Sequence, residues 1–537
     1  MKRLLRSAAV MSATALTIPL AMTTFASTAT AVSDPKPVAA GASWLAAQVP
    51  AGVVHNDQYD FDDYGLSIDA ALAFAGAGQR PAKVQQISDA IAAHVDSYTT
   101  GVDFGSSDVY AGSTAKAAVL AQTAGDDAAA YGGVDLIARL EGLVSTTAPI
   151  AGRIEDDFTP GPFAGDFANV IGQAFAAQAL AAVDSAQAPA VTSFLLQQQC
   201  SPGYFRVSFT ADKTATDQSC DGATGSADTD ATALVVLALE DQVTDPDVAD
   251  ALDAAVNWLV EQQAADGSFT SGDPLTPDKN TNSTGLAGWA LGDLGHPTEA
   301  IAAATWVRRN LAADTAPCTT KLTSQRGALA YNGPALVAGR TDGITVETMD
   351  QWRRASAQAL PVLQWAPAAD QAFDVSGPTG FVRARSTQTL RVSGLAPSSR
   401  GCLSGGGGER VLKGTGARLT ADVTVPAGTA DRVYAVSSLD GVQRTTLRAL
   451  GTLTVPFTLA KRTIAKGGLQ TVRVSGLEAG EKLTIRWRGE VVGGGVAGAA
   501  GRFTDSFRVG RTSGPGKIRV TGQFADLRSN TKSLTVR

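Results

Sequence analysis

Apolar and polar positions recur in one phrase along the first two thirds of the chain. In each full copy, a pair of apolar residues lies late in an alanine-rich stretch, and a glutamine follows the first residue of that pair by four positions. A turn comes next and ends in a glycine and a hydrophobic residue. The phrase is carried by Trp44-Leu45, Phe194-Leu195 and Trp258-Leu259, with Trp306-Val307 as a weaker copy. Similar apolar spacing surrounds Ile91 and Ile137. The six markers are 46 to 64 residues apart, a period typical of stacked helix pairs.

A second set of predicted helices alternates with the first and is richer in small and apolar residues. Its members are expected at residues 66–77, 113–124, 168–183, 230–240, 283–294 and 346–363. Ser113, Asp230 and Ser283 are residues of the type that caps helix N-termini. Because helices that are apolar almost all round belong in an interior, we expect six inner and six outer helices in an (α/α)6 toroid over residues 32–366. An open helical solenoid is the alternative.

After Trp365 the sequence pattern changes to short runs of alternating apolar and polar residues, typical of strands, separated by Gly, Ser and Pro. Residues 389–395 read TLRVSGL and return 82 residues later as TVRVSGL at 471–477. Two tandem units of about 80 residues are typical of immunoglobulin-like (Ig-like) β-sandwiches. We therefore expect a multidomain protein, an all-α toroid followed by an all-β Ig-like region, with modules at 367–455 and 456–537.

Charge separates the two regions. Residues 374–537 hold 25 Lys and Arg against 10 Asp and Glu, a net of +15, whereas residues 32–373 hold 16 against 41, a net of −25. Such asymmetry indicates two surfaces with different partners. We expect the basic tail to bind an anionic cell-wall polymer, with an ordinary soluble surface as the alternative. No nucleic-acid partner is expected.

The first 31 residues resemble a secretory signal peptide. Lys2, Arg3 and Arg6 precede a long uncharged stretch, and the small-x-small pattern Ala29-Thr30-Ala31 predicts cleavage before Val32. An uncleaved N-terminal membrane anchor is the alternative, and no later segment is apolar for long enough to span a membrane. The sequence predicts a secreted protein, associated with the cell wall through its tail, without a stable membrane anchor.

Four cysteines in an exported chain favour disulfides over a metal site. Cys200 and Cys220 flank a loop rich in Gly, Asp and Ser, so they are the more favoured pair. Cys318 and Cys402 are the second candidate pair, although spacing alone does not establish it. Neither pair has the close spacing of a zinc site, and no metal or cofactor is expected.

Three segments carry a family resemblance. Residues 262–269 read QQAADGSF, residues 228–239 read DTDATALVVLAL, and residues 282–291 read NSTGLAGWAL. Together they resemble the prenyltransferase and squalene-oxidase repeat superfamily, whose terpenoid cyclase-like toroids include cyclases, protein prenyltransferases, thioester domains and cobalamin carriers. The resemblance covers about residues 38–363 and implies the toroid fold.

Within that resemblance, the aspartic acid with which class II terpene cyclases protonate an alkene falls on Asp230, beside Asp228, while Ala231 replaces the next carboxylate of the motif. Such an acid must be kept neutral by a dry pocket. The simpler interpretation is that Asp230 caps an inner helix and Asp228 satisfies loop amides. A second D-x-D-D run, Asp60 to Asp63, lacks the T-A continuation, and capping, solvation or a calcium ion explains it as well.

Other chemistries lack their residues. The only histidines are His55, His94 and His296, none in a zinc motif, and no thioester run is present. Trp289, Tyr331 and Trp352 are candidate ligand-binding residues at the mouth of the toroid, with core packing as the alternative.

The leading prediction is a secreted, non-catalytic toroid that binds an unidentified ligand or surface partner. A diverged cyclase-like enzyme that uses Asp230 as its acid is the first alternative. A cobalamin-carrier-like protein is the second.

Overall fold

The structure, a computed structural model, describes residues 32–161, 165–222, 225–272 and 277–537. The predicted signal peptide therefore lies outside the described residues. None of the helices in the described ranges is long and apolar enough to cross a membrane.

Two sets of helices alternate along the chain up to Trp365. The outer helices are α1 (Pro35–Ala47), α3 (Pro81–Ala93), α6 (Leu136–Gly142), α8 (Ala188–Leu196), α10 (Pro246–Gln262) and α12 (Pro297–Arg309), and each contains one of the six sequence markers. Five of these six begin with a proline in the first two positions, where its missing N–H costs nothing. The inner helices are α2 (Tyr64–Gly76), α5 (Ala111–Ala124), α7 (Val170–Ala181), α9 (Thr229–Leu239), α11 (Thr281–Asp293) and α14 (Val346–Ala359).

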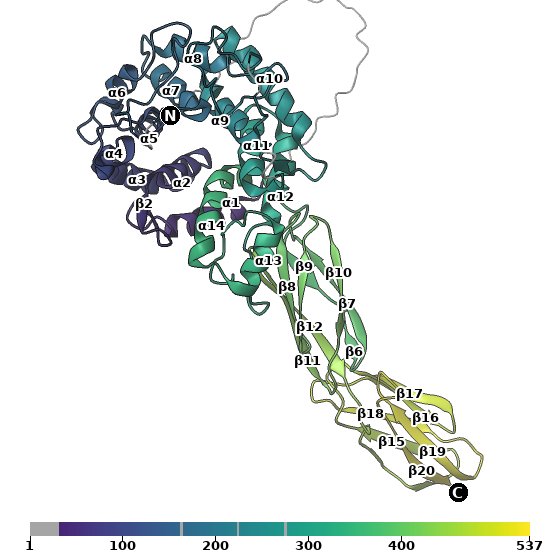
Figure 1. Ribbon diagram of the computed structural model, residues 1–537. Coiled ribbons are helices and arrows are strands. Elements are labelled where there is room, and N and C mark those ends of the chain that lie inside the picture. Colours follow the sequence, from purple (N-terminus) through teal and green to yellow (C-terminus); the bar gives the residue numbers. More distant parts are fainter. Residues whose placement is uncertain (1–31, 162–164, 223–224, 273–276) are drawn as a thin grey trace, which may run out of the picture. The chain divides into compact units, whose positions relative to one another are not determined.

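The inner helices close into a ring. Each one contacts the next along the chain, and α14 returns to contact α2, which excludes an open solenoid (Figure 1). The short helices α4 (Val95–Thr99) and α13 (Gly333–Asp342) are additions to the six pairs. Helix α14 ends at Ala359, before the predicted 363, because Pro361 cannot continue the hydrogen-bonding pattern, and a 3-10 turn (Pro361–Trp365) follows.

One turn motif, repeated five times, ties each helix pair to the next. A glycine with φ between 87° and 109° lies against a backbone carbonyl of the next outer helix, where a Cβ would approach the oxygen to 2.1–2.5 Å. Two residues later, a buried apolar residue donates its backbone N–H to a polar side chain of an inner helix at 2.8–3.0 Å. The glycines are Gly52, Gly152, Gly203, Gly267 and Gly327, and the acceptors are Ser67, Gln173, Thr232, Thr284 and Ser356. The motif explains why polar residues are buried inside otherwise apolar helices.

Close packing within the ring gives a stability prediction. A Cβ on Gly285 of α11 would lie 2.4 Å from the Cα of Ala359 in α14. We expect Gly285→Ala to destabilise the protein by about 1–3 kcal/mol, because the backbones must separate. Gly142→Ala is the matched control, since nothing lies within 4 Å of its added methyl group. Urea unfolding midpoints measure both, and an unchanged Gly285→Ala midpoint would refute this packing.

The rest of the chain forms two β modules with mixed sheets. The first contains β5 (Asp374–Ser376), β6 (Phe381–Arg383), β7 (Thr387–Ser393), β8 (Arg400–Gly405), β9 (Gly408–Lys413), β10 (Leu419–Thr424), β11 (Ala430–Ser438) and β12 (Gly441–Leu450). The second contains β13 (Phe457–Leu459), β14 (Thr463–Ile464), β15 (Leu469–Val474), β16 (Lys482–Trp487), β17 (Glu490–Val496), β18 (Phe503–Arg508), β19 (Gly514–Thr521) and β20 (Ser529–Val536).

Both modules have the same strand pattern. A three-stranded sheet (β10-β7-β5 or β13-β15-β18) accompanies a five-stranded one (β6-β12-β11-β8-β9 or β14-β20-β19-β16-β17), and each module has its own apolar core. The pairs β6–β12 and β14–β20 are parallel, and the others are antiparallel.

Candidate active site

Polar side chains cap the N-terminal ends of the inner helices. Asp63, Asn169, Asp228 and Asn280 each accept a hydrogen bond from a backbone N–H three residues further on, at 2.7–3.0 Å. For α9 the cap is Asp228, which accepts from Ala231. The expectation that Asp230 caps this helix is therefore wrong, since Asp230 is the second residue of the helix.

Asp230 has the environment of a neutral acid. Its Oδ1 atom is buried and has no hydrogen-bond partner among the described residues, although the residue as a whole is half-buried. Burial raises the pKa of Asp230 to about 7, a hydrogen bond with the Ser283 hydroxyl opposes this rise, and the charge of Asp228 adds to it. Ser283 is held in turn by Asn280, whose side-chain amide donates to its hydroxyl at 3.1 Å.

Neighbouring side chains complete a small polar cluster at this end of the ring. Asn282 of α11 occupies the same helix position as Asp230 of α9, and its Oδ1 is likewise buried without a hydrogen-bond partner among the described residues. Tyr331 lies near Asp230: burial, together with the charges of Asp230 and Asp278, raises the pKa of its phenol. Within the described residues, this cluster leaves the Oδ1 atom of Asp230 without a hydrogen-bond partner, so that this oxygen is available to a ligand.

All six inner helices line a cavity of about 330 Å³ on the axis of the ring. Leu72, Val119, Phe175, Leu234, Leu286 and Trp289 supply its apolar walls. Asp230 does not line the cavity itself but precedes Leu234 by one turn on α9, so it lies about 6 Å further along the helix axis. A second hollow of about 340 Å³ shares Lys116, Ile171 and Phe175 with the cavity. Volumes of this size are usual for ligand sites.

Charged groups also reach the cavity. Lys116 pairs with Asp69 at 2.5 Å and donates to the Gly65 carbonyl at 3.1 Å. Burial by itself lowers the pKa of Lys116, but the charge of Asp69, its hydrogen bond and the charges of Tyr98 and Asp63 together outweigh burial, so the pKa is raised and the cation persists. At the C-terminal end of α9, burial raises the pKa of Glu240 to about 8, with further contributions from Asp293 and Asp241.

The three predicted ligand-binding residues have different positions. Trp289 lines the cavity, lies against Gly76 and donates its indole N–H to Asp293 at 2.6 Å. Tyr331 is half-buried beside Asp230. Trp352 is only 2 % exposed and packs against Gly339 of α13, so its position is that of a core residue. Ligand binding by any of them stays a prediction.

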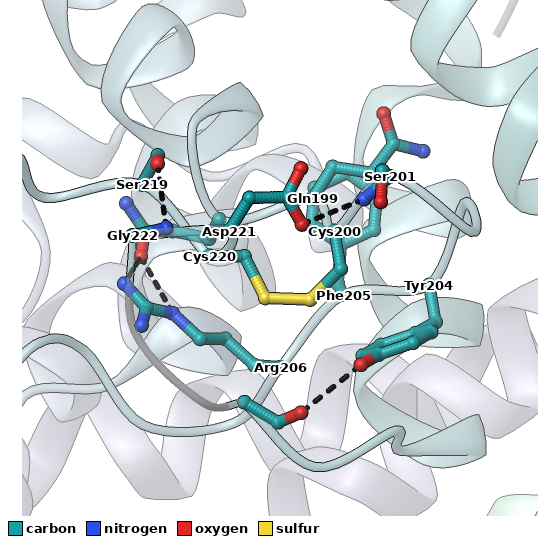
Figure 2. The surroundings of a disulfide bond; sticks show 12 residues. Gln199, Cys200, Ser201, Tyr204, Phe205, Arg206, Ser219, Cys220, Asp221 and Gly222 are labelled. Atoms are coloured by element: carbon teal, nitrogen blue, oxygen red, sulfur yellow. Dashed lines mark hydrogen bonds between the residues drawn. A yellow bond between two sulfur atoms is a disulfide. The ribbon is translucent and has the colours of Figure 1, made fainter.

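Both predicted disulfides are present, Cys200–Cys220 and Cys318–Cys402. Figure 2 shows the first, in the loop that leads from α8 to Asp228. Around it Ser201 donates its N–H to Asp221 at 3.0 Å, and the Tyr204 hydroxyl donates to the Gly225 carbonyl at 3.0 Å. Arg206, 2 % exposed, donates to the Gln198 side chain and the Gln218 carbonyl. The disulfide thus anchors the loop that precedes the acid.

Removal of this disulfide should weaken the fold. Because the two cysteines are 20 residues apart, we expect Cys200→Ala/Cys220→Ala to lose about 2–4 kcal/mol of unfolding free energy. Urea unfolding of the double variant beside the wild type measures this loss. Coincident unfolding curves would mean that the bond does not constrain the loop.

The second D-x-D-D run serves local structure. Asp63 caps α2 and pairs with Arg354 at 2.7 Å, while Asp62 hydrogen-bonds His55 at 2.9 Å. No group of three or more His, Cys, Asp or Glu side chains within the described ranges is arranged to hold a metal ion.

Sequence reasoning missed several residues of this site. Ser283 was proposed as a helix cap, yet it holds Asp230. Asn282 stands inside the NSTGLAGWAL segment and was given no role. Glu240 and the Lys116–Asp69 pair gave no signal, because isolated charges in alanine-rich helices read as solvated positions.

Comparison with solved structures finds likeness in fold. The helical part resembles the type II terpene cyclase MstE from Scytonema, at 14% identity over 61% of this chain and 97% of that chain, with a TM-score of 0.42. It also resembles ent-copalyl diphosphate synthase from Streptomyces platensis, at 16% identity over 56% of this chain and 50% of that one, with a TM-score of 0.34. The β region resembles fibronectin(III)-like modules of Clostridium thermocellum CbhA, at 13% identity over 30% of this chain and 92% of that chain, with a TM-score of 0.19. No protein-family model matches the sequence, and no curated protein matches it.

One prediction is corrected by these findings. The leading expectation of a non-catalytic binding protein is contradicted, because the similar structures include MstE with its substrate, geranylgeranyl dihydroxybenzoate, and with its product, merosterolic acid A. The inclination against an enzyme is weakened with it. At this level of identity the likeness concerns the fold, so catalysis by this chain is argued below from its own side chains. The helical part of the chain is an α/α toroid that is similar in fold to these cyclases, and a β-rich region follows it.

Proposed function

We propose that the toroid catalyses the acid-initiated cyclisation of a polyprenoid alkene, with Asp230 as the acid. The observation that carries this proposal is the carboxyl of Asp230, which has a buried, unpartnered oxygen and a pKa raised to about 7. A carboxylic acid that stays protonated near neutral pH can donate its proton to a weak base such as a C=C bond. The D-T-D-A-T-A segment around it supports the same role.

The first step breaks the O–H bond of Asp230 and forms a C–H bond at one alkene carbon. The electron pair of that C=C bond makes the new C–H bond and leaves a cation on the neighbouring carbon. Internal alkenes attack the cation and form the ring bonds. The last cation either loses a proton to a base or to water and becomes an alkene, or binds a water molecule, which then loses a proton and becomes a hydroxyl group. Solvent then returns a proton to the Asp230 carboxylate.

The cavity suits this chemistry. Leucine, valine and alanine side chains form much of its wall, and an apolar wall protects a cation from quenching by water. Phe175 and Trp289 line the same space, and aromatic rings stabilise positive charge through their π faces. With Ala231 in place of the motif's further carboxylate, Asp228 is the neighbouring charge that adjusts the acid.

We further propose that the protein acts outside the cytoplasm. In this proposal the two β modules are Ig-like and serve as spacers for the toroid. The two disulfides fit an oxidising compartment. The paired three- and five-stranded sheets, each pair with its own core, favour the Ig-like arrangement.

Product analysis tests the enzymatic proposal. The purified full chain is incubated with geranylgeraniol or squalene, and the extracts are examined by gas chromatography and mass spectrometry. We expect isomers of unchanged mass, or their hydrates, with fewer alkenes and new rings. Recovery of both polyenes unchanged, across pH 5 to 8, would oppose the proposal.

A further inference from the structure

The second β module carries an unusual cross-strand pair. Strands β16 and β19 are antiparallel neighbours in the five-stranded sheet (Figure 1). Arg486 lies directly opposite Arg519 in their register. Lys517, two residues before Arg519 on β19, adds a third exposed cation on the same face. Like charges placed directly opposite each other repel and destabilise a sheet. An arginine pair of this kind points to a function for this face.

No carboxylate in the described chain neutralises these cations. The outward positions of β16, β19 and β20 include Lys482, Thr484, Arg486, Lys517, Arg519, Thr531 and Ser533, with no Asp or Glu among them. The alternate residues Leu483, Ile485, Trp487, Ile518 and Val520 face the core of the module. Within the described ranges, none of these four basic residues forms an ion pair. The whole module, residues 456–537, has 15 Lys and Arg against 5 Asp and Glu, a net of +10.

A backbone carbonyl orients one arginine of the pair, since Arg486 donates to the Gly489 carbonyl at 2.9 Å. A guanidinium group held in this way loses little further freedom on binding, and its remaining N–H groups are available to an anion. Arg488 does not belong to this face, because its guanidinium donates to the carbonyls of Thr512 and Gly514 at 3.1 and 2.9 Å and lies 4.9 Å from the centre of the core-facing Trp487 ring.

The first module provides an internal comparison. Its strands β8 and β11 pair in the same manner as β16 and β19, and Ser404 lies opposite Ala435 where the second module has the arginine pair. The sandwich therefore accepts small neutral residues at these two positions. The arginines are not needed for the fold.

We propose that this face, defined by Arg486, Lys517 and Arg519 and called here the basic face, binds a flexible phosphodiester polymer. Neighbouring strands are about 4.8 Å apart and alternate residues along a strand about 6.7 Å apart, so the three cations form a small triangle. The two arginines across the strands enclose one phosphate, and Lys517 meets the following phosphate of an extended chain. Arginine binds phosphate oxygens in bidentate fashion. The inference is independent of the cyclase proposal.

The test uses the residues of the first module as the replacement. In the full chain, Arg486→Ser/Arg519→Ala removes the pair, while Arg473→Ser/Arg508→Ala removes two exposed arginines from the three-stranded sheet and has the same net charge. Binding of medium-length inorganic polyphosphate is measured by titration at several salt concentrations. We expect the first variant to bind at least about tenfold more weakly, with a shallower salt dependence, and the control to change by less than about threefold. Without ligand, the first variant should melt at the same temperature as the wild type or higher.

Each outcome decides the matter. Equal losses in both variants would mean that only net charge counts and would overturn the basic face. Equally tight binding of poly-L-glutamate would overturn the phosphate assignment. Tighter binding of duplex DNA than of polyphosphate would contradict the assignment of a flexible polymer as the ligand.

Discussion

Replacing Asp230 with asparagine is expected to lower the rate of polyprenoid cyclisation by at least about 10³-fold while leaving the protein folded. Asparagine has nearly the same shape and can still meet the Ser283 hydroxyl, but an amide has no acidic proton to donate to an alkene. The rate of product formation, measured by mass spectrometry, gives the loss in activity. Circular dichroism and the melting temperature show whether the fold is kept.

Asp228→Asn is the matched control. Asparagine caps helices about as well as aspartate, so α9 should begin unchanged. Since the charge of Asp228 only assists the rise in the pKa of Asp230, we expect a change in rate of less than about tenfold. If Asp228→Asn lost as much activity as Asp230→Asn while both stayed folded, the assignment of the acid would have to move to Asp228.

The activity should fall as the pH rises above about 7. The reaction needs Asp230 protonated, and its pKa is raised to about 7, so each further pH unit reduces the competent fraction of enzyme up to about tenfold. Rates of the wild type between pH 5 and 9 give the profile. An activity that instead rises from pH 7 to 9 would show that the group in question acts as a carboxylate.

The same pKa shift has a consequence for stability. Because the folded-state pKa of Asp230 lies above its unfolded value of 3.8, the folded protein binds more protons between about pH 4 and 7. Stability that is fully present below pH 4 is therefore lost as the pH rises through 7. Asp230→Asn removes this dependence and should be more stable than the wild type at pH 8 by about 1–3 kcal/mol. This value is smaller than the whole pKa shift would give, because solvent near the half-buried residue screens the charge. Urea unfolding at pH 5 and pH 8 measures the difference.

Much of the helical fold could be predicted because its signals are local. The six markers fall in the six outer helices, since an amphipathic helix that ends at a glycine leaves a pattern in the chain itself. Closure of the ring depends on the contact of α14 with α2, which are far apart in sequence and leave no such pattern. The number of predicted helices favours the toroid over the solenoid, and the contact that closes the ring is visible only in three dimensions.

The site was predicted less well, for an identifiable reason. The sequence places Asp228 and Asp230 together but assigns the cap of α9 to Asp230, whereas Asp228 is the cap and Asp230 has the buried oxygen. A shift of only two residues along the chain separates these two roles. Trp352 and Trp289 looked alike on inner helices, yet one packs outward against Gly339 and the other lines the axial cavity. The direction in which a side chain near a helix end points depends on contacts with other helices, and the local sequence does not contain these contacts.

Cyclisation in D₂O tests the central claim most directly. If Asp230 delivers a solvent-derived proton to the alkene, the wild-type product should carry one deuterium at the initiating carbon, and Asp230→Asn should yield none of this product. A cyclic product without deuterium, or one formed equally well by Asp230→Asn, would contradict the account.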